Sequence, residues 1–179
     1  ESLGATLTYG EVDRASRDFA AYLQQRCGLE KGDRVAIMMP NVLQYPVAVF
    51  AAFRAGLTVV NCNPLYTARE LEHQLKDSGA KAIVVLENFA KTVQEVVART
   101  PVEHVITTEI GDLFPPLKRL LTNLVVKYGK KLVPPWQIDG AVDLRTALAS
   151  GKGMKLEPVA LGPDDIAYLQ YTGGTTGTP

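Results

Sequence analysis

Short apolar runs alternate with amphipathic stretches at helical spacing between residues 8 and 107, and this alternation leaves few folds open to the chain. Four of the runs predict buried strands: residues 34–39, 57–62, 81–86 and 104–107. Parallel strands need crossover connections, and a helix between successive strands supplies them. The pattern therefore predicts an α/β fold: a doubly wound, mostly parallel sheet flanked by helices.

Two helix starts are marked by capping boxes, in which a threonine and a glutamate three residues later bond each other's backbone N–H groups. Thr8 and Glu11 mark the first helix, and Thr67 and Glu70 mark the second. Gly79 offers a stop for the second helix, because glycine readily takes left-handed backbone angles. We therefore expect helices to begin directly after Thr8 and Thr67.

Two further helices are expected without a capping box. One starts between Asn41 and Pro46 and should turn Phe50 toward the core. The other should have Asn88 as its N-cap and end before Pro101. With these two, each predicted strand is joined to the next through a helix.

Composition argues against several classes of protein. The 179 residues carry 19 Lys and Arg against 19 Asp and Glu, so we expect no nucleic-acid partner. Cys27 and Cys62 have no metal-ligand spacing and form no disulfide framework, which indicates a reducing compartment such as the cytoplasm. His73 and His104 stand in no arrangement typical of a catalytic triad.

The strand–helix rhythm breaks in an insert at about residues 111–140, where residues 113–133 predict a basic amphipathic helix. Its apolar residues recur at helical spacing: Leu117, Leu120, Leu121, Leu124, Val125 and Tyr128. Its cations are Lys118, Arg119, Lys127, Lys130 and Lys131. Two interpretations stay open: peripheral contact with an anionic membrane, or a core-packed helix with a solvated basic face.

A glycine- and threonine-rich run follows the last predicted strand, residues 165–171. Its members are Thr172, Gly173, Gly174, Thr175, Thr176 and Gly177. Such a loop can expose several backbone N–H groups at once, which is how proteins cradle phosphate oxygens. It is not a P-loop, because Thr178 and Pro179 stand where that motif continues with glycine and lysine. The alternative is a plain surface loop.

The run from Tyr171 to Pro179 resembles the phosphate-binding loop of the AMP-forming adenylating enzymes. That superfamily includes acyl-CoA synthetases, peptide-synthetase adenylation domains and luciferases. Residues 7–12 and 32–35 are similar to its opening motif. Other stretches resemble its fatty acid–CoA ligase branch, most of all the bacterial long-chain ligases: residues 53–56, 61–67, 69–71 and 77–81.

The resemblance implies that residues 1–179 are the N-terminal portion of a large adenylate-forming domain, with a phosphate loop at 171–179. Tyr171 would end the strand that aims the loop, and residues 172–177 would wrap the β- and γ-phosphates of ATP. Thr172 matches a threonine that helps to hold Mg²⁺ in the family. The family's catalytic lysine and acid pocket lie further along the chain, so we expect no catalytic residue here and no activity from these residues alone.

The implied activity of the parent protein is ATP-dependent conversion of a long-chain fatty acid and coenzyme A to acyl-CoA, through an acyl-adenylate. An adenylating enzyme for an aryl, medium-chain or amino acid is one alternative, and a non-catalytic nucleotide-binding module is another.

The strand at 165–171 would have an unsupported edge without later strands. We therefore expect either displacement of residues 173–179 or an oligomer, such as a homodimer, that covers this edge. We expect a cytoplasmic protein, peripheral on the inner face of the membrane if the insert binds lipid.

Overall fold

A computed structural model describes residues 1–171, and within them six strands form one sheet in the order β5-β4-β3-β1-β2-β6. The strands are β1 Arg34–Met38, β2 Thr58–Asn61, β3 Ala82–Leu86, β4 His104–Thr108, β5 Val142–Asp143 and β6 Tyr168–Leu169. Every neighbouring pair is parallel. The predicted α/β fold is confirmed, and the described sheet is parallel throughout.

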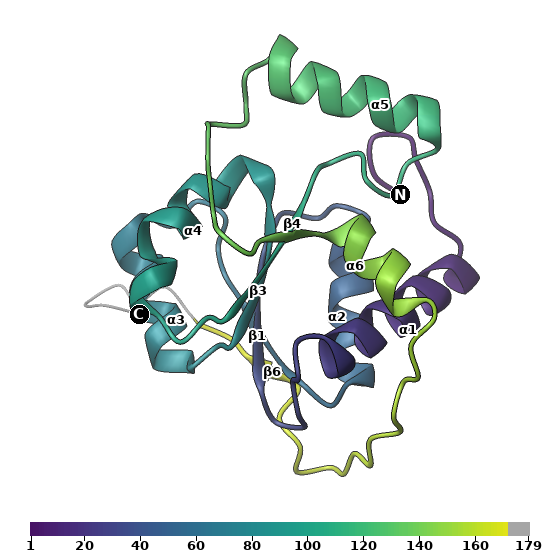
Figure 1. Ribbon diagram of the computed structural model, residues 1–179, viewed down its shortest axis with the longest axis vertical. Coiled ribbons are helices and arrows are strands. Elements are labelled where there is room, and N and C mark those ends of the chain that lie inside the picture. Colours follow the sequence, from purple (N-terminus) through teal and green to yellow (C-terminus); the bar gives the residue numbers. More distant parts are fainter. Residues whose placement is uncertain (172–179) are drawn as a thin grey trace.

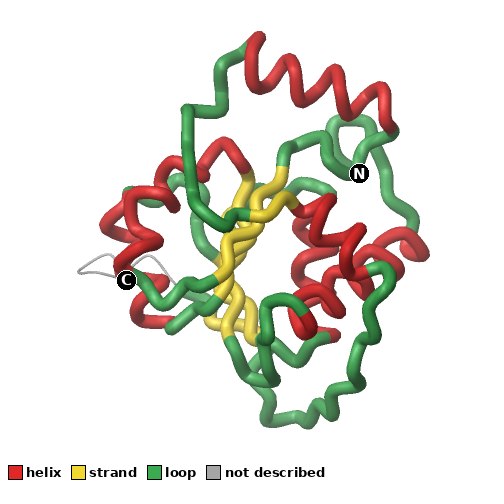
Figure 2. The backbone as a smooth tube through the Cα atoms, in the orientation of Figure 1, coloured by secondary structure: helices red, strands yellow, loops and turns green. Residues whose placement is uncertain are grey.

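Helices cover both faces of this sheet (Figures 1 and 2). On one face α1 (Tyr9–Gln25) lies against α2 (Gln44–Arg54) and α6 (Leu144–Gly151). On the other face α3 (Ala68–Ser78) lies against α4 (Ala90–Val96). The result is three layers, as expected for parallel strands joined by helical crossovers.

Alternate residues of β1 point into two separate apolar cores. Val35 and Ile37 pack with the α1–α2–α6 layer, whereas Ala36 and Met38 pack with the α3–α4 layer. Because side chains alternate along a strand, a strand buried on both faces reads as a continuous apolar run. This double burial is why residues 34–39 show no polar alternation.

Both capping boxes are present as predicted. The Thr8 hydroxyl accepts a hydrogen bond from the Glu11 N–H, and the Glu11 carboxylate accepts one from the Thr8 N–H. Thr67 and Glu70 make the same pair of bonds at the start of α3. Gly79 ends α3 with a φ of 61°, in the left-handed region. Local hydrogen bonding thus determines where these two helices begin and where α3 ends.

Two local predictions are wrong. Phe50 is 51% exposed, because the buried side of α2 is centred on Ala48, Ala51 and Ala52, and Phe50 projects away from them. Asn88 is not an N-cap; it lies in a short 3₁₀ turn (η1, Glu87–Phe89) that precedes α4. Its side-chain amide instead donates to the Leu132 carbonyl at 3.0 Å, which joins this turn to the distant insert.

The final predicted strand is shorter than residues 165–171. Within the described residues β6 pairs with β2 through two residues, Tyr168 opposite Val59 and Leu169 opposite Val60. It lies at one edge of the sheet, as predicted for a strand without a second neighbour. Helix α6 begins at Leu144, directly after the short strand β5.

Candidate functional site

The carboxyl ends of all six strands meet at one edge of the sheet, because the strands are parallel. The strand order reverses at β1, since β2 lies on one side of it and β3 on the other. In open parallel sheets, ligands bind in the crevice outside the carboxyl ends near such a reversal. Within the described residues, two hollows lie along this edge.

One hollow, called the amide hollow here, lies at the ends of β1, β2 and β6 and has a volume of about 440 Å³. Its lining residues are Ile37, Met39, Asn41, Tyr45, Asn61, Cys62, Asn63, Tyr66, Gln170 and Tyr171. Within residues 1–171 no lysine, arginine, aspartate or glutamate lines it. Burial raises the pKa of the Cys62 thiol to about 12, so this group is also neutral at physiological pH. The described lining is thus neutral, and amides and phenols supply its polar groups.

Asn61 connects three elements around the amide hollow. Its side-chain oxygen accepts a hydrogen bond from the Tyr45 hydroxyl of α2 at 3.0 Å. Its side-chain nitrogen donates to Gln170 Oε1, just beyond β6, at 3.2 Å. Its backbone carbonyl accepts from Gln74 Nε2 of α3 at 2.9 Å. One asparagine therefore links α2, α3 and the segment that follows β6.

Tyr171 lies at the rim of the same hollow, two residues after β6 ends at Leu169, so it does not end the strand as the sequence predicts. Its hydroxyl donates to the Asp77 carboxylate of α3 at 2.5 Å. Burial, followed by the hydrogen bond to Asp77, raises the pKa of the Tyr171 phenol to about 12. The phenol is therefore a protonated donor at neutral pH, and it adds no negative charge to the hollow.

The other predicted site residues lie outside the described residues: Thr172, Gly173, Gly174, Thr175, Thr176, Gly177, Thr178 and Pro179. The expected displacement of residues 173–179 and the metal role of Thr172 lie outside them too. Within residues 1–171 no group of three or more His, Cys, Asp or Glu side chains is arranged to hold a metal ion.

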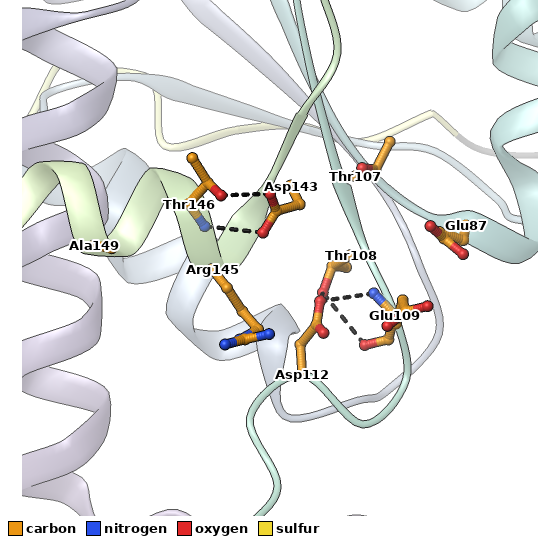
Figure 3. Close-up of a pocket in the computed structure, with 9 residues that line it drawn as sticks. All are labelled: Glu87, Thr107, Thr108, Glu109, Asp112, Asp143, Arg145, Thr146 and Ala149. Carbon is orange, nitrogen blue, oxygen red and sulfur yellow. Dashed lines mark hydrogen bonds between the residues drawn. The ribbon is translucent and has the colours of Figure 1, made fainter. Parts of the chain in front are cut away.

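A second hollow, called the acidic hollow here, lies at the ends of β3, β4 and β5 and has a volume of about 490 Å³ (Figure 3). Its lining residues are Glu87, Thr107, Thr108, Glu109, Asp112, Asp143, Arg145, Thr146 and Ala149. Asp112 is buried and accepts hydrogen bonds from the Thr108 hydroxyl and the Glu109 N–H, each at 2.8 Å. Asp143 caps α6 by accepting from the Thr146 N–H at 2.9 Å.

The acidic hollow is unfavourable for an anion. Burial raises the pKa of Asp112, and burial together with Glu87 and Asp112 raises the pKa of Glu109. Arg145 points toward Asp112 and favours its ionised form (Figure 3). The described lining holds four carboxyl groups and this one guanidinium, and Lys127 outside the lining pairs with Glu87 at 3.3 Å. A polyphosphate placed here would meet like charges.

Apart from Tyr171, the sequence predicts no role for the side chains of either hollow. Asn61 lies in the stretch 61–67 that carries part of the family resemblance, and Tyr45 and Gln170 belong to no predicted motif. The available signal was an asparagine at the end of a predicted strand, where parallel sheets place ligand-contacting groups.

The predicted basic helix is α5 (Pro116–Leu124), continued by a π-helical turn (η3, Val125–Gly129). No residue of either element is buried. Its apolar residues are exposed by 45–72%: Leu117, Leu120, Leu121, Leu124, Val125 and Tyr128. The core-packed interpretation of this helix is therefore wrong for the described part of the chain.

Polar side chains hold α5 to the rest of the protein. Lys118 donates to the Leu3 carbonyl at 2.7 Å, and Asn123 donates to the Glu109 carboxylate at 2.6 Å. Lys127 forms an ion pair with Glu87 at 3.3 Å. The helix thus turns a polar side toward the protein and leaves its leucines exposed, the reverse of an ordinary surface helix. No helix within residues 1–171 is long and apolar enough to cross a membrane.

The parallel sheet flanked by helices agrees with the family that the sequence matches. The AMP-binding enzyme family matches residues 2–179, so the chain belongs to that family. The chain is 56% identical over 176 residues to a long-chain-fatty-acid–CoA ligase of Escherichia coli O157:H7, covering 98% of the chain. A ligase of the same description from Bacillus subtilis is 35% identical over 180 residues. The chain spans 31% of the length of each of these two relatives.

Solved structures of related proteins share the fold. A long-chain-fatty-acid–CoA ligase from Archaeoglobus fulgidus superimposes with a TM-score of 0.71 at 28% identity, over 96% of this chain and 28% of that one. An anthranilate–CoA ligase gives a TM-score of 0.75 at 18% identity, over 97% of this chain and 28% of that one, which is evidence for the fold alone. The sheet flanked by helices is thus the architecture of acyl-CoA ligase structures.

Proposed function

We propose that the whole protein activates long-chain fatty acids. The fatty acid carboxylate attacks the α-phosphorus of ATP and releases pyrophosphate, and the thiol of coenzyme A then displaces AMP from the acyl-adenylate. Residues 1–179 would be the N-terminal portion of its large adenylate-forming domain, with the insert at about 111–140 and the phosphate loop at 171–179. The observation that carries the proposal is 56% identity to a long-chain-fatty-acid–CoA ligase over 98% of this chain.

The role proposed for this chain is to position ATP, since the reaction needs orientation and charge stabilisation rather than a general base. Two features of the amide hollow support this role. Its described lining is neutral, so it does not repel a polyphosphate. Its rim ends at Tyr171, directly before the glycine- and threonine-rich run. Thr172 is the residue proposed to hold Mg²⁺, which would supply positive charge to the phosphates.

Acid-dependent ATP–pyrophosphate exchange by the full-length protein tests the proposal. The panel contains short- to long-chain fatty acids, aryl acids and amino acids. We expect exchange to be greatest with long chains and to fall when Thr175 is changed to Val, which removes a hydroxyl of the proposed phosphate loop. Thr122→Val, at a half-buried threonine of α5, is the matched control and should leave exchange unchanged.

Other outcomes of this experiment separate the alternatives. Exchange that is greatest with an aryl, medium-chain or amino acid would keep adenylation and reject the long-chain substrate. A folded full-length protein that exchanges with no acid in the presence of Mg²⁺ would reject the enzyme and favour a non-catalytic nucleotide-binding module.

We also propose that the leucine face of α5 rests on an anionic membrane, which would place a cytoplasmic protein peripherally on the inner face. The argument is the reversed packing: apolar side chains face solvent, and Lys130 and Lys131 are exposed beside them. Leucines at such a surface enter the acyl boundary while lysines pair with anionic headgroups.

Leu120→Ser in the full-length protein tests the membrane contact, because Leu120 is 56% exposed on this face. We expect co-sedimentation with vesicles of phosphatidylcholine and phosphatidylglycerol to weaken about tenfold. Leu161→Ser is the matched control, because Leu161 is also 56% exposed but lies outside the insert. Equal binding by both variants and the unchanged protein would mean that the remainder of the protein or a second copy covers the face, and light scattering would identify a dimer.

A further inference from the structure

Side chains hold the segment around β6 more than sheet pairing does. Within the described residues β6 (Tyr168–Leu169) pairs with β2 over its own two residues. Before it, the Thr58 hydroxyl donates to the Ile166 carbonyl at 2.9 Å. The Phe53 and Tyr168 rings pack edge to face, with centroids 5.2 Å apart. The approach to Thr172 therefore depends on individual contacts.

Two side-chain contacts hold the chain between β6 and Thr172: Tyr171 with Asp77, and Gln170 with Asn61. The Asn61 amide donates to Gln170 Oε1 at 3.2 Å, two residues before Thr172. Asn61 is itself held from two sides, by the Tyr45 hydroxyl and by Gln74 Nε2. Gln74 is 2% exposed, so moving the Asn61 carbonyl would leave a buried amide unpaired. The side chain and the backbone carbonyl of Asn61 are therefore each held by a neighbouring helix, and Gln170 is bonded to this side chain.

We propose that Asn61 is a positioning residue for the nucleotide phosphates: by holding Gln170, it sets where the chain enters the run that begins at Thr172. This inference rests on the proposed function and adds Asn61 to it, a residue that lies 111 positions before Thr172 in the sequence. Asn61 would act through Gln170 and not by touching ATP. Small displacements of binding groups are costly, since affinity depends on donors held in place before the ligand arrives.

The test uses the full-length protein and measures the ATP dissociation constant by calorimetry, with no fatty acid present. Asn61→Ala and Gln170→Ala are each expected to weaken ATP binding about tenfold, because each removes the hydrogen bond between Asn61 and Gln170. The double variant should be no weaker than either single variant, because both changes remove the same contact.

Thr58→Val is the matched control, since it removes a hydrogen bond to Ile166, further from Thr172, and preserves the side-chain shape. It should lower stability to a similar degree and leave ATP affinity unchanged. The proposal is overturned if Asn61→Ala leaves ATP affinity within about twofold of the parent, if the two single effects multiply, or if Thr58→Val weakens ATP equally. If ATP still binds and its binding still depends on Asn61, but long-chain fatty acids give no exchange, only the proposed substrate is rejected.

Discussion

The amide hollow and the acidic hollow lie at the same edge of one sheet, yet their electrostatics are opposite. In the amide hollow the described lining carries no charged side chain, and its polar groups are amides and phenols. In the acidic hollow the described lining holds one guanidinium, that of Arg145, and four carboxyl groups: Glu87, Glu109, Asp112 and Asp143. Topology supplies both, because every parallel strand ends at this edge. Side chains, and not the fold, decide which one suits an anion.

The two hollows also differ in what holds them together. In the acidic hollow Asp112 is held by local hydrogen bonds, from the Thr108 hydroxyl and the Glu109 N–H. The amide hollow depends on contacts between residues far apart in sequence, such as Asn61 with Gln170. Hydrogen bonds between neighbouring residues form wherever the local chain folds, whereas the contact between Asn61 and Gln170 forms only when β6 pairs with β2. We therefore expect changes in the amide hollow to have the larger effect on nucleotide binding.

The largest effect is expected from Asn63→Asp, which adds a carboxylate to the amide hollow. The fold should tolerate the change, because Asn63 Oδ1 accepts from the Leu65 N–H at 3.0 Å and aspartate can do the same. A negative charge near the phosphates should weaken ATP binding about tenfold or more. Calorimetry on the full-length protein at low and high salt checks this, and the loss should be smaller at high salt.

Asp143→Asn is the control for that change in the acidic hollow. Asparagine can still cap α6 at the Thr146 N–H, so the helix start is preserved while one carboxylate is removed. ATP affinity should stay within about twofold of the parent. A gain of affinity as large as the loss from Asn63→Asp would indicate that the phosphates bind in the acidic hollow.

Tyr171→Phe should have an intermediate effect. It removes the hydrogen bond to Asp77, which stabilises the end of β6 by about 1 kcal/mol. Urea denaturation of the full-length protein measures the loss. The pKa of Tyr171 is about 12, so the phenol keeps its proton up to strongly alkaline pH, and the difference in stability between the two proteins should stay constant from pH 6 to pH 9. A difference that vanished within this range would contradict the hydrogen bond to Asp77.

The smallest effect is expected from Asp112→Asn in the acidic hollow. Burial raises the pKa of Asp112 in the folded state, so the folded protein binds its proton more tightly than the unfolded chain does. The contribution of Asp112 to stability is therefore greatest at acidic pH and falls as the pH rises through the folded-state pKa. Asparagine does not titrate and can still accept from Thr108, so the variant should gain stability relative to the parent as the pH rises. Denaturation of both proteins between pH 4 and pH 8 measures this; a constant difference would contradict the raised pKa.

The sequence predicted the sheet well because its strands are buried on both faces and its helices carry local start and stop signals. Thr8, Thr67 and Gly79 act through residues within a few positions, so their pattern is visible in the chain. Phe50 and Asn88 were predicted wrongly because their environment depends on how α2 packs and where the insert returns. Tertiary packing overrides local preference in both cases.

The candidate site was predictable only in part. The structure places Tyr171 at the rim of the amide hollow, while the nucleotide role that the family resemblance gives it stays a prediction. The contact between Asn61 and Gln170 could not be predicted, because it requires β6 to pair with β2 across 108 residues of sequence. The reversed orientation of α5 was equally hidden, since a periodic pattern does not say which side of a helix faces the protein.

The most direct test of the central claim is a crystal structure of the full-length protein with a non-hydrolysable ATP analogue and Mg²⁺. We predict that the triphosphate lies at the amide hollow, beside the segment that follows Gln170 and Tyr171, with Asn61 still bonded to Gln170. A triphosphate bound in the acidic hollow beside Asp112 and Arg145 would contradict the claim.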